Sequence, residues 1–245
     1  MRLVELFIIE TTEEDRAIIS LANVIYRHVG KYSDYVDPES TKPVPVGKIG
    51  DFADTPLDGF EDINIELQQG EALGRRVATA NQEEYDGRKI GGIWSNTGPT
   101  ITLNADNIDS ERIKSTIVHE LRHALDDLKS EGRAGSSERY STPKKKEHRK
   151  KDPHSEKNYP YLAAPEEINA RFGEVLNGLT DSISKNANMR PDQLWDHEIK
   201  VLKRLLSAYD ISTLFPEREK SKDYKRLIKR AVDFIQKEIK YIQSV

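Results

Sequence analysis

The stretch DSERIKSTIVHELRHALDDLK, residues 109–129, predicts an amphipathic helix around which the rest of the chain can be interpreted. Asp109 or Ser110 can cap its N-terminus, because a short side-chain oxygen accepts a hydrogen bond from a backbone N–H of the first turn. Apolar side chains recur at helical spacing, at Ile113, Ile117, Leu121, Ala124 and Leu128. This stripe is expected to face a hydrophobic core.

The same helix carries His119-Glu120-Leu121-Arg122-His123, an HExxH pattern. Residues four positions apart lie one turn apart on one helix face, so both histidines can reach a single metal ion. Glu120 leans toward the same side and can accept a proton without ligating the ion. The pattern predicts a metal site on the face roughly opposite the apolar stripe.

Two histidines leave a catalytic zinc site incomplete, since such a site takes three protein ligands and keeps one position open. A helix predicted from Pro165 onward offers two adjacent carboxylates, Glu166 and Glu167. The sequence alone allows either. Glu167 is favoured, because it adjoins the apolar stripe that starts at Ile168, whereas Glu166 is expected to face solvent. The chain has no cysteine, which excludes thiolate ligands, thiolate nucleophiles and disulfides.

Six further side chains are candidates for supporting roles near the metal. Those that can stabilise a developing oxyanion are Tyr159, Tyr161 and His197. Those that can orient a ligand through a hydrogen bond or a charge are Asp126, Asp127 and Arg171. For Arg171, steadying a substrate carbonyl is an alternative role.

The remaining patterns predict an α+β fold, in which a small mixed sheet is followed by a helical half. Strand-type patterns cover residues 3–10, 63–68, 89–95 and 99–104, the last two as a hairpin. Helical patterns cover residues 13–30, 165–179, 192–209 and 221–243. The segment 31–62 is rich in Pro, Asp and Gly and predicts irregular structure, attached to the surface by Phe52, Leu57 and Phe60.

Residues 132–158 have no apolar periodicity and predict an exposed, mobile insertion. Within it, residues 144–151 hold six basic side chains and one acidic one, which could attract an acidic partner. The first 98 residues carry 10 basic and 18 acidic side chains, and the remaining residues carry 28 and 24. An acidic front half and a mildly basic back half disfavour a nucleic-acid-binding protein.

On these residues the chain resembles the zincin metallopeptidases, in particular the gluzincins. The resemblance is carried by HELRH at 119–123, by EINA at 167–170 as an ExxA second motif, and by the preceding strand PTITLN. It implies one Zn²⁺ per chain, held by His119, His123 and Glu167. It also implies hydrolysis of a protein or peptide substrate by metal-activated water, with Glu120 as general base and the substrate along a strand edge.

The resemblance also suggests a zincin-like catalytic domain over residues 1–180, which includes the insertion, and a helical subdomain over residues 181–245 packed on it. One departure from the family is Arg171, because some gluzincins have a supporting aspartate near the metal ligands at this position, four residues after the ligand glutamate. The alternative function is a non-catalytic structural or interaction protein, such as a virion component, on a zinc-binding zincin scaffold. No run of 18 apolar residues and no secretion signal is present, so we expect no membrane span and a cytoplasmic or virion-associated location.

Overall fold

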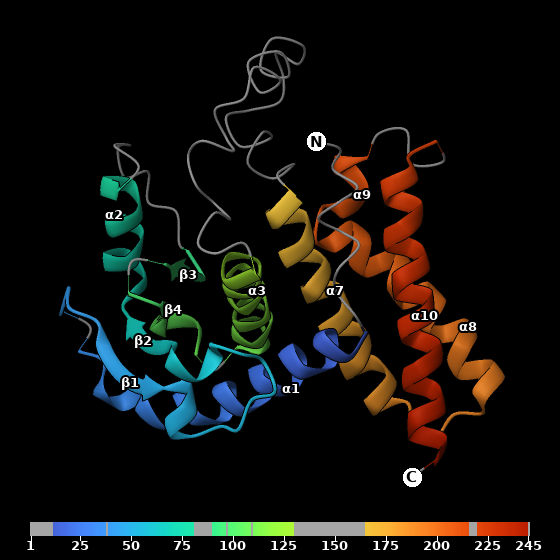
Figure 1. Cartoon of the computed structure of the whole chain (residues 1–245), viewed down its shortest axis with the longest axis horizontal. Helices are drawn as coiled ribbons and strands as arrows, with labels where there is room; N and C mark the ends of the chain where they lie inside the picture. The colour runs from blue at the N-terminus through green and yellow to red at the C-terminus, as the bar shows by residue number, and fades with distance from the viewer. Residues whose placement is uncertain are drawn as a thin grey trace. The chain divides into compact units, whose positions relative to one another are not determined.

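The computed structural model describes residues 12–37, 39–80, 90–96, 98–108, 110–129, 165–215 and 220–244 (Figure 1). The chain divides into two compact units. The sheet unit is Arg16–Ala134, and the helical unit comprises Met1–Asp15 together with Gly135–Val245. The strand predicted over residues 3–10 and the insertion predicted over 132–158 lie outside the described residues.

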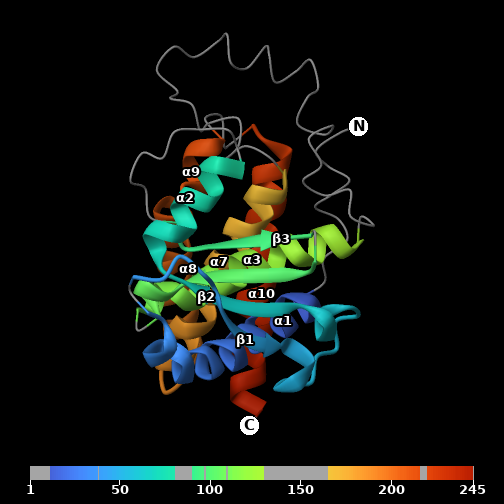
Figure 2. The same cartoon turned by 90° about the vertical axis from the view of Figure 1, so that its left-hand side faces the viewer.

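A four-stranded mixed sheet forms part of the sheet unit (Figure 2). Its strands are β1 (Val44–Lys48), β2 (Asn64–Gln68), β3 (Gly92–Ser95) and β4 (Thr100–Asn104), in the order β1-β2-β4-β3. β1 is antiparallel to β2, β2 is parallel to β4, and β4 is antiparallel to β3. The strand predicted over 63–68 and the hairpin predicted over 89–104 are therefore confirmed, and so is the α+β class.

The prediction of irregular structure over residues 31–62 is wrong at strand β1. Pro45 and Gly47 both disfavour a β conformation, so the sequence of this segment does not indicate a strand. Gly47 has a φ of 135°, and the pairing register with β2 shifts between Pro45 and Gly47. Val46 is nevertheless buried, so packing and pairing with β2 hold a strand that local propensity does not favour.

Three helices accompany the sheet, α1 (Thr12–Val29), α2 (Gly70–Ala80) and α3 (Glu111–Lys129). One face of the sheet packs with α1 and α3 in a common hydrophobic core, to which the strands contribute Ile65, Leu67, Ile101 and Leu103. On the opposite face, Glu66 and Gln68 line a groove with Ala72 and Arg75 of α2. Helix α2 was not predicted.

The apolar stripe of α3 is buried as predicted over most of its length. Ile113, Ile117, Leu121 and Ala124 are fully buried against the sheet and α1. The prediction is wrong for Leu128, which is 36% exposed in the last turn. The buried stripe anchors one side of α3 and leaves the side that bears the histidines available for a site.

The helical unit contains α7 (Pro165–Lys185), α8 (Pro191–Ala208), the short α9 (Ile211–Leu214) and α10 (Lys222–Ser244). These confirm the helices predicted over 165–179, 192–209 and 221–243. Helix α7 packs against both α8 and α10, so this unit does not follow the predicted division at residue 180, which lies inside α7. Among the described residues, no helix is both long and apolar enough to cross a bilayer.

An acidic side chain is buried inside the helical unit. Glu198 of α8 is fully buried, and its Oε1 accepts a hydrogen bond of 2.8 Å from the Ser182 hydroxyl on α7. Burial raises the pKa of Glu198 above its ordinary value, and the Ser182 hydrogen bond and the charges of His197 and Arg204 oppose this only in part. The protonated form is therefore favoured in the fold more than in the unfolded chain.

We expect Glu198→Gln to stabilise the helical unit at neutral pH. Since the folded-state pKa is raised, the folded protein binds more protons than the unfolded chain, and stability falls as the pH rises through the unfolded and then the folded pKa. Glutamine keeps a partner for Ser182 without the charge, which is expected to raise the free energy of unfolding at pH 7. Urea unfolding at several pH values tests this, with the exposed Asp196→Asn on the same helix as control. An equal pH dependence in wild type and Glu198→Gln would contradict the prediction.

Candidate metal centre

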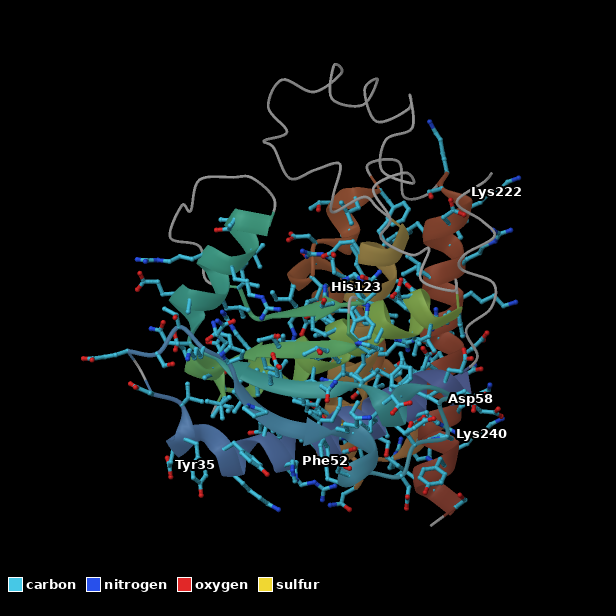
Figure 3. The ribbon with its side chains drawn as sticks, turned by 60° about the vertical axis from the view of Figure 1, so that its left-hand side comes forward. Tyr35, Phe52, Asp58, His123, Lys222 and Lys240 are labelled. Atoms are coloured by element: carbon cyan, nitrogen blue, oxygen red, sulfur yellow. The ribbon has the colours of Figure 1, made fainter. Side chains whose placement is uncertain are left out.

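Helix α3 holds His119 and His123 one turn apart on one face, as the HExxH spacing predicts. Figure 3 labels His123 on this helix. The two Nε2 atoms lie 3.0 Å apart, and the ring centroids are 4.7 Å apart. Both side chains are half-buried. Two nitrogen lone pairs at this distance repel each other unless a proton or a cation lies between them. The pair can therefore share a proton or ligate one ion.

Glu120 is almost fully buried, and strand β3 passes close to it. A Cβ added at Gly92 would come within 3.2 Å of Glu120 Cγ and 3.0 Å of a Thr116 methyl group. At Gly91 an added Cβ would meet the Thr116 hydroxyl oxygen at 2.8 Å. The two glycines thus allow the strand to approach α3 at the position of the candidate base. The signal visible in the sequence is the Gly-Gly pair inside the strand-type run 89–95, because glycine within a strand often marks a close approach of another element.

The sheet order corrects one expectation about the substrate. Strand β4, which is formed by the last five residues of PTITLN, lies between β2 and β3 and so has both sides paired. It therefore offers no free edge. Of the described strands, β3 is the one at the edge of the sheet nearest α3, with which it makes extensive contact.

The acidic residues that follow the motif lie at the end of α3 and are buried. Asp126 and Asp127 are 7% and 5% exposed, and Arg122, inside the motif, is 1% exposed. Burial raises the pKa of Asp127, and the neighbouring Trp94 and Asn96 side chains oppose this only in part. Asp127 of α3 thus lies beside the β3–β4 hairpin. Orienting a metal ligand stays a prediction for both aspartates.

Glu167 lies in the first turns of α7, in the helical unit, and its side chain is buried. Its Oε1 accepts a hydrogen bond of 2.9 Å from Arg171 Nε, one turn further along the helix. The contact with Glu167 that the first predicted role of Arg171 requires is therefore present, and the orienting role itself stays a prediction. The side chain of Glu166 lies outside the described residues.

The candidate oxyanion stabilisers are placed only in part. His197 is partly exposed on α8, with Nε2 3.5 Å from the Asn186 amide nitrogen and 3.9 Å from Glu198 Oε1. Tyr159 and Tyr161 lie outside the described residues, as does the basic run 144–151. A role in oxyanion stabilisation therefore stays a prediction for all three.

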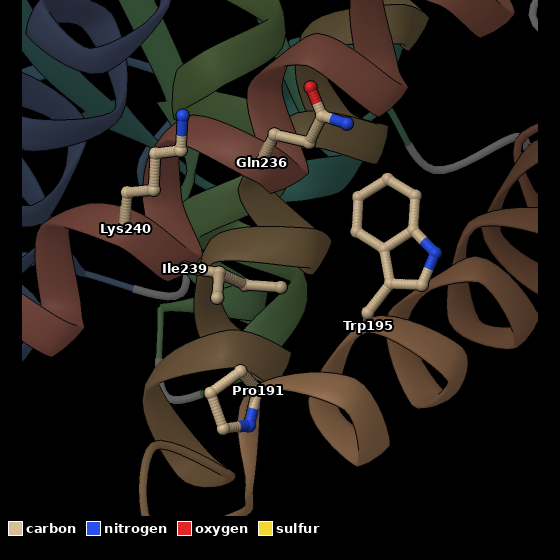
Figure 4. A pocket seen from close by; sticks show the side chains of 5 residues that line it. All are labelled: Pro191, Trp195, Gln236, Ile239 and Lys240. Carbon is tan, nitrogen blue, oxygen red and sulfur yellow. The ribbon is translucent and has the colours of Figure 1, made fainter.

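A separate hollow lies in the helical unit, between the start of α8 and the end of α10 (Figure 4). It is lined by Pro191, Trp195, Gln236, Ile239 and Lys240. None of these is a candidate metal ligand or base. We therefore base no function on this hollow.

Comparison with protein-family models, curated proteins and solved structures gave no match to this chain. The resemblance to zincins accordingly rests on the motif residues themselves.

Proposed function

We propose that the protein is a zinc-dependent peptidase. The observation that carries this proposal is the HExxH pattern on one continuous helix. The Nε2 atoms of His119 and His123 lie 3.0 Å apart, and the side chain of Glu120, the residue that follows His119, is buried. Histidine pairs spaced in this way with an intervening glutamate suit a catalytic zinc site. No cysteine is available for another kind of zinc site.

The donor set fits zinc. Two nitrogen ligands about 2.0–2.1 Å from a tetrahedral zinc ion lie about 3.3 Å apart, close to the separation of the two histidine Nε2 atoms. In this proposal His119 and His123 supply two imidazole ligands and Glu167 supplies a carboxylate as the third. When bound, zinc supplies a Lewis acid that polarises a carbonyl and lowers the pKa of a coordinated water to about 7.

Glu120 supplies the proton transfers in this proposal. Its carboxylate accepts the proton of the attacking water and then delivers it to the leaving amine of the cleaved peptide. Burial keeps bulk water away from the carboxylate, and contact with β3 at Gly92 limits its freedom. A positioned base of this kind accelerates a reaction by about 10²–10⁴-fold.

The edge strand β3 suits an extended peptide substrate. A strand at the edge of a sheet has unpaired backbone N–H and C=O groups, which can bind an extended chain as an additional strand. Since β3 lies against α3 beside Glu120, a peptide added there would run near the candidate base. We propose this strand, in place of β4, as the place where the substrate backbone binds.

Metal content and cleavage together test the proposal. Wild-type protein, stripped with a chelator and then dialysed against zinc, is expected to retain about one Zn²⁺ per chain, and His119→Ala is expected to lose it. The zinc-loaded protein should cleave a fluorescein-labelled unfolded protein such as casein, or members of a mixed peptide library. Zinc bound without any cleavage would instead favour a non-catalytic structural or interaction protein. Absence of zinc from the wild type would contradict both.

A further inference from the structure

Arg171 joins the candidate ligand Glu167 to the turn between α8 and α9. Its Nε donates a hydrogen bond of 2.9 Å to Glu167 Oε1, and its Nη1 donates one of 3.2 Å to the backbone oxygen of Tyr209. Nη1 also lies 3.7 Å from Oδ2 of Asp210. Two of the three guanidinium nitrogens are therefore engaged inside the helical unit.

The backbone at this turn has an uncommon conformation. Asp210 has a φ of 59°, in the left-handed region that few residues other than glycine, asparagine and aspartate adopt. It precedes α9, whose first residue, Ile211, is fully buried. The turn is thus held by packing of the following helix, and it offers Arg171 a fixed carbonyl and a nearby carboxylate.

The contact with Glu167 is shielded from water. The Glu167 side chain is 3% exposed and the Arg171 side chain 21% exposed. A charge-assisted hydrogen bond in such a setting is stronger and more directional than one at the surface. The glutamate precedes the arginine by four residues, the favourable order for a pair within one helix.

We propose that Arg171 is a positioning residue that holds the Glu167 carboxylate in one orientation, with Oε1 bound to the guanidinium and Oε2 as the ligand atom. This inference rests on the proposed zinc site. The engagement of Nε and Nη1 within the protein speaks against the alternative role, contact with a substrate carbonyl.

Zinc affinity tests the proposal without any need for a substrate. We expect Arg171→Met to weaken zinc binding by about 10–100-fold, the usual effect of losing a hydrogen-bond partner of a metal ligand. Arg171→Lys should recover part of this loss, because it keeps the charge but cannot make both contacts. Competition with a chromophoric chelator measures the affinity, and circular dichroism of the zinc-free protein measures the fold. Arg190→Met, which removes an exposed arginine paired with Asp192, is the matched control and should leave affinity unchanged.

The outcomes separate this inference from the zinc site itself. If Arg171→Met binds zinc as tightly as the wild type, the inference is wrong, even where the variant melts at a lower temperature. Should Arg171→Met fail to fold, Arg171→Lys decides, and an affinity within about twofold of the wild type would overturn the inference. If the wild type binds no zinc at all, the proposed function fails first.

Discussion

Replacing Glu120 with glutamine is expected to abolish measurable turnover while leaving the fold and the bound zinc intact. Glutamine is nearly isosteric with glutamate, so the close approach of Gly92 to the side chain can be kept. The amide cannot accept the proton that a general base must take, and the loss should reach about 10²–10⁴-fold in kcat. Initial rates on the labelled unfolded protein, with zinc content measured in the same samples, provide the measurement.

Glu61→Gln is a suitable control for this substitution, because Glu61 is exposed and lies outside the candidate site. It makes the same chemical change and is expected to leave both turnover and zinc content unchanged. Full activity in Glu120→Gln would remove Glu120 from the mechanism. Loss of zinc in that variant would instead mean that Glu120 acts on the metal site rather than as a base.

The second large effect concerns which glutamate completes the zinc site. Glu167→Gln is expected to weaken zinc binding by more than about tenfold, because loss of a ligand should exceed the effect of losing a partner of a ligand. Glu166→Gln makes the same change one position earlier, about 100° away around the helix, and is expected to change zinc binding little. Zinc titration against a competing chelator, on both variants in parallel, makes this comparison.

Each outcome of this pair is informative. A large loss in Glu166→Gln with little effect in Glu167→Gln would mean that the helix register inferred from the apolar stripe is wrong. Equal, small effects in both would show that neither carboxylate is a ligand. The buried contact of Glu167 with Arg171 favours the expected order, since this carboxylate is held away from bulk solvent.

Most helices could be predicted from the sequence, and two elements of the sheet unit could not. In α3, apolar residues such as Ile113 and Ile117 recur at helical spacing, so the sequence alone indicates which face of the helix is buried. Strand β1 has no such pattern, since Pro45 and Gly47 interrupt it and its stability comes from pairing with β2. Helix α2 (Gly70–Ala80) has only a short apolar run, at Ala72 and Leu73, which is too short to show a helical period in the sequence.

The sequence by itself determined the candidate chemistry of this protein. Histidines four residues apart must share a face of any helix that contains them, so His119 and His123 converge wherever α3 packs. The tertiary structure alone decided which strand is at the sheet edge, that Gly92 approaches Glu120, and that the α8–α9 turn supports Arg171. The physical reason is the separation of the contacting residues along the chain. The relation between residues i and i+4 follows from helix geometry alone. The contact of Arg171 with Tyr209 joins residues 38 positions apart and forms only once the helices have packed.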